Sequence, residues 1–425
     1  MLSCGQCCRV AGFVGRLGRK GPREMADEQP LTFLCITSYE KGHAFLRECK
    51  RQGCYVVLLT VDRLRDAPWP HDSIDEFHTI PDLFNREDAI RAASHIARRR
   101  YLDRIVPLDD YDVFMAAHLR EHFRVPGMGD TTARYFRDKL AMRMQALEKG
   151  ILVPPFVPVI NYDRLREYMD RVPPPWVLKP RAEAASIGIK RIYGSEELWR
   201  ALDELGDRQS YFLLEKYIPG DVSHVDAITY EREVLFAEVH KYGAPPLNVM
   251  HEGGLFVTRT LPRESPESTQ VRDLHDRVLG LLGFVRGATH TEFIRGREDG
   301  EYYFLETAAR VGGAHITDLV HATTGIDLWA EWAKLEIAGG DRPYALPAYW
   351  KDYGGMIVCL ARQEWPDTGA YNDPEVVLRI NRRHHAGLVV VSPDSARVQA
   401  LLDNYQPRFY NDFFANLPAP DRPPT

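Results

Sequence analysis

The sequence has no apolar run that approaches membrane-spanning length and no excess of positive charge. Its 60 acidic and 54 basic residues give a net charge of −6, which offers no electrostatic basis for binding nucleic acid or an anionic membrane. Cysteine is scarce, with seven in 425 residues, and this odd number argues against a disulfide framework. We therefore expect a protein of the reducing cytoplasm with neither nucleic acid nor membrane as a partner.

The chain also lacks the G-x-G-x-x-G fingerprint of dinucleotide sites, although its first folded part has an α/β pattern. Strand-like and helical runs alternate between residues 31 and 110, which is typical of a parallel sheet with covering helices. Without the fingerprint, an NAD-dependent oxidoreductase is disfavoured. The strands are expected at 31–38, 54–61 and 104–110, and the helices at 43–51 and 88–100.

The first thirty residues do not fit this pattern. They are rich in arginine, contain no acid before Glu24 and show little periodicity. A transit peptide has such a composition, and an over-extended start with Met25 as the true first residue explains it equally well. We expect residues 1–30 to be a disordered or mis-assigned extension.

Residues 287–314 contain two strand-like runs joined by a charged turn. A two-residue turn at Asp299-Gly300 would send Glu292 and Glu306 to opposite faces of the hairpin. A three-residue loop, with Gly300 in the left-handed region, pairs Arg297 with Glu301 and places the two glutamates opposite each other. Their Cβ atoms would then lie roughly 5 Å apart.

Two carboxylates this close repel each other unless a cation or a shared proton lies between them. Mg²⁺ or Mn²⁺ is suited to this position, because such a hard cation takes oxygen ligands and keeps sites open for phosphate. The hairpin thus predicts a metal site at Glu292 and Glu306. The alternative is an ordinary surface hairpin with scattered acids, which these residues, taken alone, favour slightly.

The motifs EF at 292–293 and FLETAARVGG at 304–313 resemble the end of the ATP-binding core in the ATP-grasp superfamily. The resemblance is to its branch of carboxylate–amine and L-amino-acid ligases. It implies an α/β protein with an α+β core, and ATP with Mg²⁺ or Mn²⁺ as cofactors. The implied parts are an N-terminal parallel α/β (pre-ATP-grasp) domain at 31–125, the ATP-grasp core at 126–340 with a lid at 176–220, and a small α+β C-terminal subdomain at 341–425.

The resemblance also implies a set of ATP-binding residues. Lys179 ends an apolar strand, where an uncompensated ammonium is costly, and phosphates would relieve that cost. The family's ribose-binding glutamate corresponds to Val222 here, so Asp221 or His224 is expected to replace it. The implied set is Lys139 and Lys179 for the phosphates, Ser186 and Gly188 in the flap, and Glu215, Lys216 and Ile218 at the hinge, the last two through main-chain groups.

Further residues are implied for substrate and catalysis. Arg310, four residues beyond Glu306, would hold an acyl phosphate and the oxyanion formed when an amine attacks, with Lys179 as the second catalytic group. Ala308 stands where many relatives have a metal-binding asparagine. The substrate candidates are His251 on a loop, His290 on the face of Glu292, Arg310, and the glycine pair Gly312 and Gly313, which lets backbone approach a ligand.

Together these features predict an ATP-dependent carboxylate–amine ligase that forms an amide or peptide bond through an acyl phosphate and releases ADP and phosphate. Its partners would be a small carboxylate and a small amine of amino-acid type, and a homodimer is left open. Two alternatives stay open as well. One is N-carboxylation with bicarbonate, as in biotin-carboxylase-like relatives. The other is a non-catalytic ATP-binding regulatory protein, which Val222 and Ala308 suggest.

Overall fold

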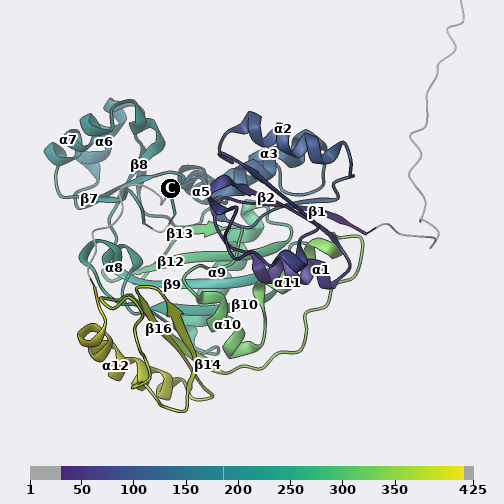
Figure 1. Cartoon of the computed structure of the whole chain (residues 1–425). Helices are drawn as coiled ribbons and strands as arrows, with labels where there is room; N and C mark the ends of the chain where they lie inside the picture. The colour runs from purple at the N-terminus through teal and green to yellow at the C-terminus, as the bar shows by residue number, and fades with distance from the viewer. Residues whose placement is uncertain (1–29, 185, 416–425) are drawn as a thin grey trace, which may run out of the picture. The chain divides into compact units, whose positions relative to one another are not determined.

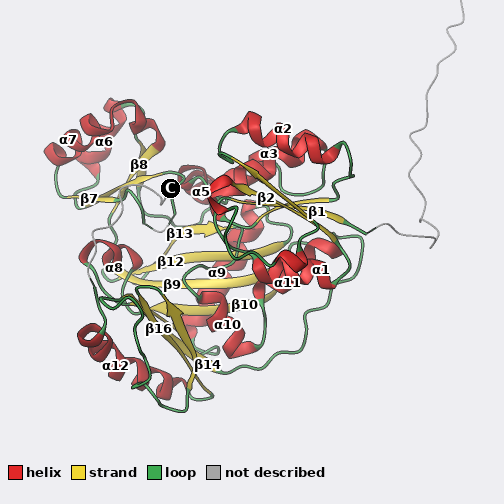
Figure 2. Ribbon diagram, in the orientation of Figure 1, coloured by secondary structure: helices red, strands yellow, loops and turns green. Residues whose placement is uncertain are grey.

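A computed structural model of the chain describes residues 30–184 and 186–415, apart from the side chains of 250–252. Residues 1–29 and 416–425 lie outside the described part, and so does the expectation made for the N-terminal extension. Figure 1 shows the described elements in chain order, and Figure 2 shows which are helices and which are strands. The described residues from Leu31 onward form one unit by their contacts.

The N-terminal part is a four-stranded parallel sheet in the order β3-β2-β1-β4. Every residue of its central strand β1 is buried, as expected when helices cover both faces of a parallel sheet. This confirms the predicted α/β domain, although strand β3 was not predicted. The elements are β1 (Thr32–Thr37), α1 (His43–Arg51), β2 (Tyr55–Val61), β3 (Glu76–Ile80), α2 (Arg86–Ala97), β4 (Arg104–Pro107) and α3 (Val113–Phe123).

A second, four-stranded antiparallel sheet in the order β5-β8-β6-β7 forms the lid. Its apolar side packs on two helices around Leu165, Leu178 and Leu198. The lid begins twenty residues before the predicted residue 176, because β5 and the first of these helices belong to it. Its elements are β5 (Phe156–Pro158), α6 (Tyr162–Arg171), β6 (Trp176–Pro180), β7 (Lys190–Ile192), α7 (Ser195–Leu205) and β8 (Phe212–Lys216).

The largest sheet has eight antiparallel strands in the order β13-β12-β9-β10-β11-β14-β16-β15. Its last three strands come from the predicted C-terminal subdomain, so residues beyond 340 extend the core sheet. The strands are β9 (Gly220–Tyr230), β10 (Glu233–Tyr242), β11 (Phe256–Thr260), β12 (Gly287–Gly296), β13 (Tyr302–Ala308), β14 (Tyr353–Leu360), β15 (Val376–Arg382) and β16 (His385–Ser392).

The two faces of this sheet have different roles. On one face, which we call the back, Val225 and Val239 pack with Val271 of α9 (Pro266–Leu282). On the other, the front, Ile228 packs with residues of α10 (Ile316–Thr324) and α11 (Leu328–Ala338). Helix α12 (Ser395–Asp412) covers the C-terminal strands. Within the described chain, no helix combines the length and apolar character that crossing a bilayer requires.

Three segments depart from the sequence-based expectation. Residues 132–150 have the amphipathic pattern of a single helix, but the structure contains α4 (Asp130–Arg134) and α5 (Lys139–Glu148), because Asp138 caps the second helix. The predicted loop over 244–258 contains α8 (Pro246–Glu252), which starts with proline at its first position, where the missing N–H costs nothing. Residues 316–340 have a helical pattern in the sequence, but the structure breaks this run at Gly325, which has φ +79°.

The hairpin of β12 and β13 pairs Glu292 with Glu306 as predicted, but by another route. Gly296 pairs with Glu301 around a four-residue turn, so the predicted pairing of Arg297 with Glu301 is wrong. That turn alone would place Leu305 opposite Glu292. A β-bulge at Leu305 adds one residue to β13 and restores the pairing of the two glutamates.

Candidate active site

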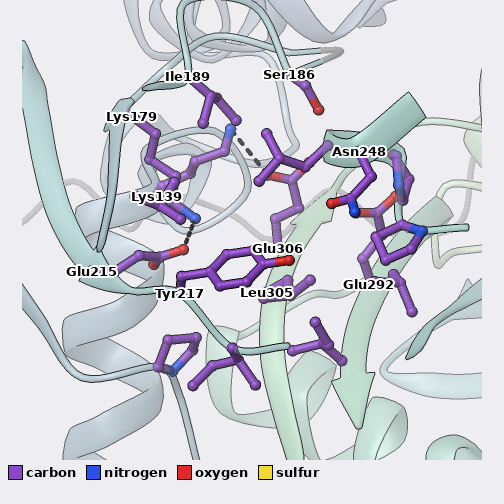
Figure 3. A pocket seen from close by; sticks show the side chains of 18 of the residues that line it. Lys139, Lys179, Ser186, Ile189, Glu215, Tyr217, Asn248, Glu292, Leu305 and Glu306 are labelled. Carbon is purple, nitrogen blue, oxygen red and sulfur yellow. Dashed lines mark hydrogen bonds and ion pairs between the residues drawn. The ribbon is translucent and has the colours of Figure 1, made fainter. Parts of the chain in front are cut away.

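A pocket lies between the lid and the front of the large sheet, and its empty space, counted with the part open to solvent, is about 870 Å³. Figure 3 shows side chains from the lid, α5, α8 and the hairpin around this pocket. The structure brings together there eight of the predicted site residues: Lys139, Lys179, Ser186, Glu215, Lys216, Ile218, Glu292 and Glu306.

The two glutamates of the hairpin face each other at the base of the pocket. Oε2 of Glu306 lies 3.0 Å from the Lys139 ammonium. Burial would raise the pKa of Glu306, but the charges of Lys139 and Lys179 outweigh it and lower this pKa to about 2. Among the described residues, Glu292 Oε2 and Glu306 Oε1 have no bonding partner. These two oxygens can therefore serve a hard divalent cation, whose preferred donors they are.

The two lysines are fixed by different contacts. Lys139, the first residue of α5, donates a hydrogen bond to the Glu183 carbonyl at 2.6 Å. Lys179 is buried on β6 and contacts the Glu215 carboxylate, whose other oxygen accepts from Arg143 Nε at 3.1 Å. Burial lowers the pKa of Lys179 to about 8, against the opposing effect of Glu215. An entering phosphate would meet two cations already in place.

The Glu215 side chain is thus engaged with Lys179 and Arg143 instead of lying open to a nucleotide. Burial would raise its pKa, but these two cations hold that pKa below its ordinary value. Sequence analysis missed Arg143, which is fully buried. The signal was present, because Arg143 follows Lys139 by four residues and so shares its helix face.

The hinge segment after β8 carries the apolar end of the pocket. The Lys216 amide donates to the Pro155 carbonyl at 2.8 Å, and the Lys216 ammonium donates to the Pro173 carbonyl at 2.9 Å. Ile218 lines the pocket, and within the described chain its amide N–H has no acceptor. That N–H is available to an acceptor nitrogen of a purine ring.

The flap loop after β6 closes the pocket from the lid side. Ser186 adopts φ +57° and lines the pocket. Gly188 adopts φ +68° beside Pro180 and lies between the lining residues Ile187 and Ile189. Small residues there let main-chain groups approach a ligand. Ala185, which precedes Ser186 in this loop, lies outside the described residues.

The predicted substitutes for a ribose-binding glutamate do not reach the pocket. Asp221 and Lys241 form an ion pair of 3.2 Å on the back of the sheet, because alternate residues of β9 point to opposite faces and Val222 takes the front. His224 is fully buried against Asp226. Both predictions are therefore wrong in this geometry. Asn248 of α8 lines the pocket instead, and it was missed because the sequence suggested a loop there.

The predicted substrate residues lie beyond Glu292 and outside the pocket lining. Arg310 donates to the Val311 carbonyl at 2.7 Å, and its buried Nε has no hydrogen-bond partner. His290 lies 2.9 Å from Asp226 and 3.5 Å from Glu292. Burial opposes its charged form, but Asp226 and Glu292 outweigh burial and raise the pKa of His290 to about 9.

The glycine pair after Arg310 runs close to the large sheet. A Cβ atom on Gly312 would lie 2.6 Å from Asp226 Oδ1, whereas one on Gly313 would meet nothing within 4 Å. Only Gly312 is therefore required by close packing. The last substrate candidate, His251, falls in α8, and its side chain lies outside the described residues.

The site thus consists of a lid sheet, a large antiparallel sheet and, between them, a pocket lined by lysine and glutamate side chains. A family model described as an ATP-grasp domain matches residues 172–318. This match and the similarity in fold to a solved ligase confirm the predicted resemblance to the ATP-grasp superfamily and the predicted fold class.

Within that class the chain is similar to L-amino acid ligases. It is 27% identical over 300 residues to the L-arginine-specific L-amino acid ligase of Bacillus subtilis, a match that covers 69% of this chain and 72% of that relative. The L-amino acid ligase from Bacillus licheniformis has a TM-score of 0.73 at 17% identity, over 92% of this chain and 100% of the other. N5-carboxyaminoimidazole synthetase from Staphylococcus aureus, complexed with ADP, has a TM-score of 0.68 at 16% identity, over 89% and 98%.

Proposed function

We propose that this chain is an ATP-dependent carboxylate–amine ligase that joins two small substrates of amino-acid type. The observation that carries the proposal is the facing pair Glu292 and Glu306 beside two lysine ammonium groups at one pocket. A triphosphate with a divalent cation matches this arrangement, because the cation meets the carboxylates and the phosphates meet the lysines. The similarity to named L-amino acid ligases supports amide formation and amino-acid substrates.

Each part of the pocket has a role in this proposal. The Ile218 N–H would hold the adenine ring, and Lys139 and Lys179 would neutralise the phosphates. Glu292 and Glu306 would hold Mg²⁺ or Mn²⁺. When bound, the cation shields the phosphate charge and orients the γ-phosphoryl group for in-line transfer.

The chemistry then runs in two steps. The substrate carboxylate attacks the γ-phosphorus, and the bond to ADP breaks, which leaves an acyl phosphate. The amine attacks the acyl carbon, phosphate leaves, and the nitrogen loses a proton to give the amide. We assign the oxyanion of the second step to Arg310, and the lack of a hydrogen-bond partner at its buried Nε supports this role. Gly312, Gly313 and His290 would border the substrates, and positioning supplies most of the rate.

The test is a screen of amino-acid pairs, arginine included, with ATP and Mg²⁺ in bicarbonate-depleted buffer. Phosphate release that needs both amino acids, with a product whose mass is their sum less one water, is the expected result. Phosphate release that requires bicarbonate would instead support N-carboxylation. This alternative is tested because a biotin carboxylase is among the solved structures with a similar fold. Thermal stabilisation by ATP without any turnover would favour the regulatory alternative.

The metal assignment predicts the behaviour of Glu306→Ala. Loss of one facing carboxylate removes half of the protein's cation ligands, so ATP turnover should fall to background while the far-ultraviolet circular dichroism spectrum stays unchanged. Phosphate release measured at saturating ATP checks this. Wild-type turnover in Glu306→Ala would refute the metal assignment.

A further inference from the structure

Two side chains from different strands contact the same oxygen of Glu292. The Tyr242 hydroxyl on β10 donates a hydrogen bond to Glu292 Oε1 at 2.9 Å. His290 Nε2 lies 3.5 Å from that same oxygen. In the described part of the chain, the other oxygen, Oε2, takes part in no hydrogen bond or ion pair. The protein therefore holds Oε1 of Glu292, while Oε2 is available to a ligand in the pocket.

His290 is in turn held from behind by Asp226. Asp226 Oδ1 lies 2.9 Å from His290 Nδ1, and its Oδ2 lies 2.8 Å from His224 Nδ1. His224 Nε2 lies 2.8 Å from the Thr258 hydroxyl. Asp226, His224 and Thr258 are fully buried. The register of β9 and β12, which pairs Asp226 with His290 and His224 with Glu292, fixes the whole row.

Tyr242 is fixed by packing as well. It is 6% exposed, and its ring lies 4.5 Å from that of His224 and 5.4 Å from that of Phe256, measured between centroids. A phenol ring enclosed in this way cannot swing its hydroxyl away from Glu292 without disturbing its neighbours. The hydroxyl therefore acts on Glu292 from a constant position.

We propose that Tyr242 and the Asp226–His290 pair are positioning residues that orient Glu292 so that Oε2 alone binds the divalent cation. This inference rests on the proposed function, which gives Glu292 to the cation. Groups that bind a metal ligand from outside fix its orientation, and their loss typically costs about 10- to 100-fold in metal affinity or activity. Tyr242 and Asp226 themselves contact neither the cation nor the substrates.

The test measures free Mn²⁺ by electron paramagnetic resonance in titrations of the full chain with a non-hydrolysable ATP analogue. Tyr242→Phe removes only the hydroxyl, and Asp226→Asn removes the charge that holds His290. Each should raise the Mn²⁺ dissociation constant about tenfold. Phosphate release by Tyr242→Phe should recover towards the wild-type maximum at high Mg²⁺, because the loss lies in cation binding.

Tyr302→Phe is the matched control. Tyr302 lies on β13, it is 5% exposed, and its hydroxyl has no hydrogen-bond partner, so its removal should leave Mn²⁺ affinity unchanged. Glu292→Gln separates the two proposals. If it weakens Mn²⁺ binding and Tyr242→Phe does not, the positioning proposal is overturned alone. If Glu292→Gln has no effect, the metal assignment and the positioning proposal both fall.

Discussion

At the scale of single residues, the pocket depends on three charged groups that are almost wholly removed from water. Arg143, Lys179 and Glu215 are each less than 7% exposed, and a buried charge is tolerated only when it is paired. Glu215 lies between the two cations and accepts hydrogen bonds from both. The excess positive charge is one unit, and it is directed at the pocket.

Lys179→Met tests whether this charge serves the nucleotide. The change keeps the side-chain length but removes the ammonium, and hydrogen bonds to charged groups contribute about 1.5–3 kcal/mol. ATP affinity, measured by isothermal titration calorimetry, should therefore fall at least about tenfold.

Lys216→Met is the companion variant. The Lys216 ammonium is bonded to the Pro173 carbonyl, and the proposed function gives this side chain no role in binding ATP. Its ATP affinity should stay at the wild-type value. Equal losses in the two variants would contradict the proposed phosphate role of Lys179.

At the scale of elements, the start of α5 is joined to the lid. Asp138 accepts hydrogen bonds from the Leu140 and Ala141 amides and from Arg181 Nε at 3.0 Å. The Lys139 amide donates to the Arg181 carbonyl at 2.7 Å. One N-cap residue therefore ends the preceding turn, starts the helix and holds Lys139 beside the flap.

Asp138→Ala should lower the free energy of unfolding by about 1–2 kcal/mol through loss of the cap. It should also weaken ATP binding, because Lys139 loses its fixed neighbour. Urea denaturation and calorimetric titration measure the two effects.

Asp327→Ala offers a matched control, since Asp327 caps α11 through two amides in the same way and does not line the pocket. It should lose similar stability and keep ATP affinity. A loss of stability without a loss of ATP affinity in Asp138→Ala would show that the cap does not position Lys139.

For the hairpin of β12 and β13, the sequence predicted the strands correctly but did not predict how they contact the rest of the structure. The strands of the hairpin and the facing glutamates were correct, because alternation and a glycine turn are local signals. The turn length was wrong, and a bulge at Leu305 corrected the register; bulges depend on contacts such as that of the Leu305 carbonyl with Arg143. The prediction for Asp221 was wrong because successive residues of β9 point to opposite faces of the sheet, so a shift of one residue moves a side chain from the front to the back.

The same contrast applies to the rest of the pocket. Lys139 and Lys179 were found because a resemblance fixed their positions in the chain. Asn248, Tyr242 and Asp226 were missed, because they reach the site from strands or helices distant in sequence. The burial of these side chains and the identity of their partners depend on how the strands pair in the large sheet, which the local sequence does not indicate.

At the scale of the whole molecule, the front of the large sheet contains a buried histidine that affects stability. His240 is fully buried, and neither ring nitrogen has a hydrogen-bond partner among the described residues. Burial, with a smaller effect of His224, lowers the pKa of His240 from 6.5 to about 3. The unfolded chain therefore binds a proton between pH 6.5 and 3 that the folded chain does not.

Because the unfolded state binds more protons in that window, the free energy of unfolding should fall as the pH is lowered through it. One such group contributes up to about 1.4 kcal/mol per pH unit. His240→Phe removes the group, so its stability should fall less steeply between pH 6.5 and 4 in urea denaturation. The exposed His95 of α2 supplies the control, His95→Phe, which should keep the wild-type slope. Equal slopes in all three proteins would contradict the prediction.

The extra residue in β13 has a consequence for how a ligand can fit in the pocket. Leu305 and Glu306 are neighbours in the chain, and both turn toward the pocket, whereas successive residues of a regular strand point to opposite sides. The apolar side chain of Leu305 and the carboxylate of Glu306 are therefore separated by a single peptide unit of fixed length. A ligand that shifts along the pocket to improve its contact with Leu305 loses its contact with Glu306. The fixed spacing of the two residues therefore restricts the distance between the apolar part and the charged part of a ligand that fits both.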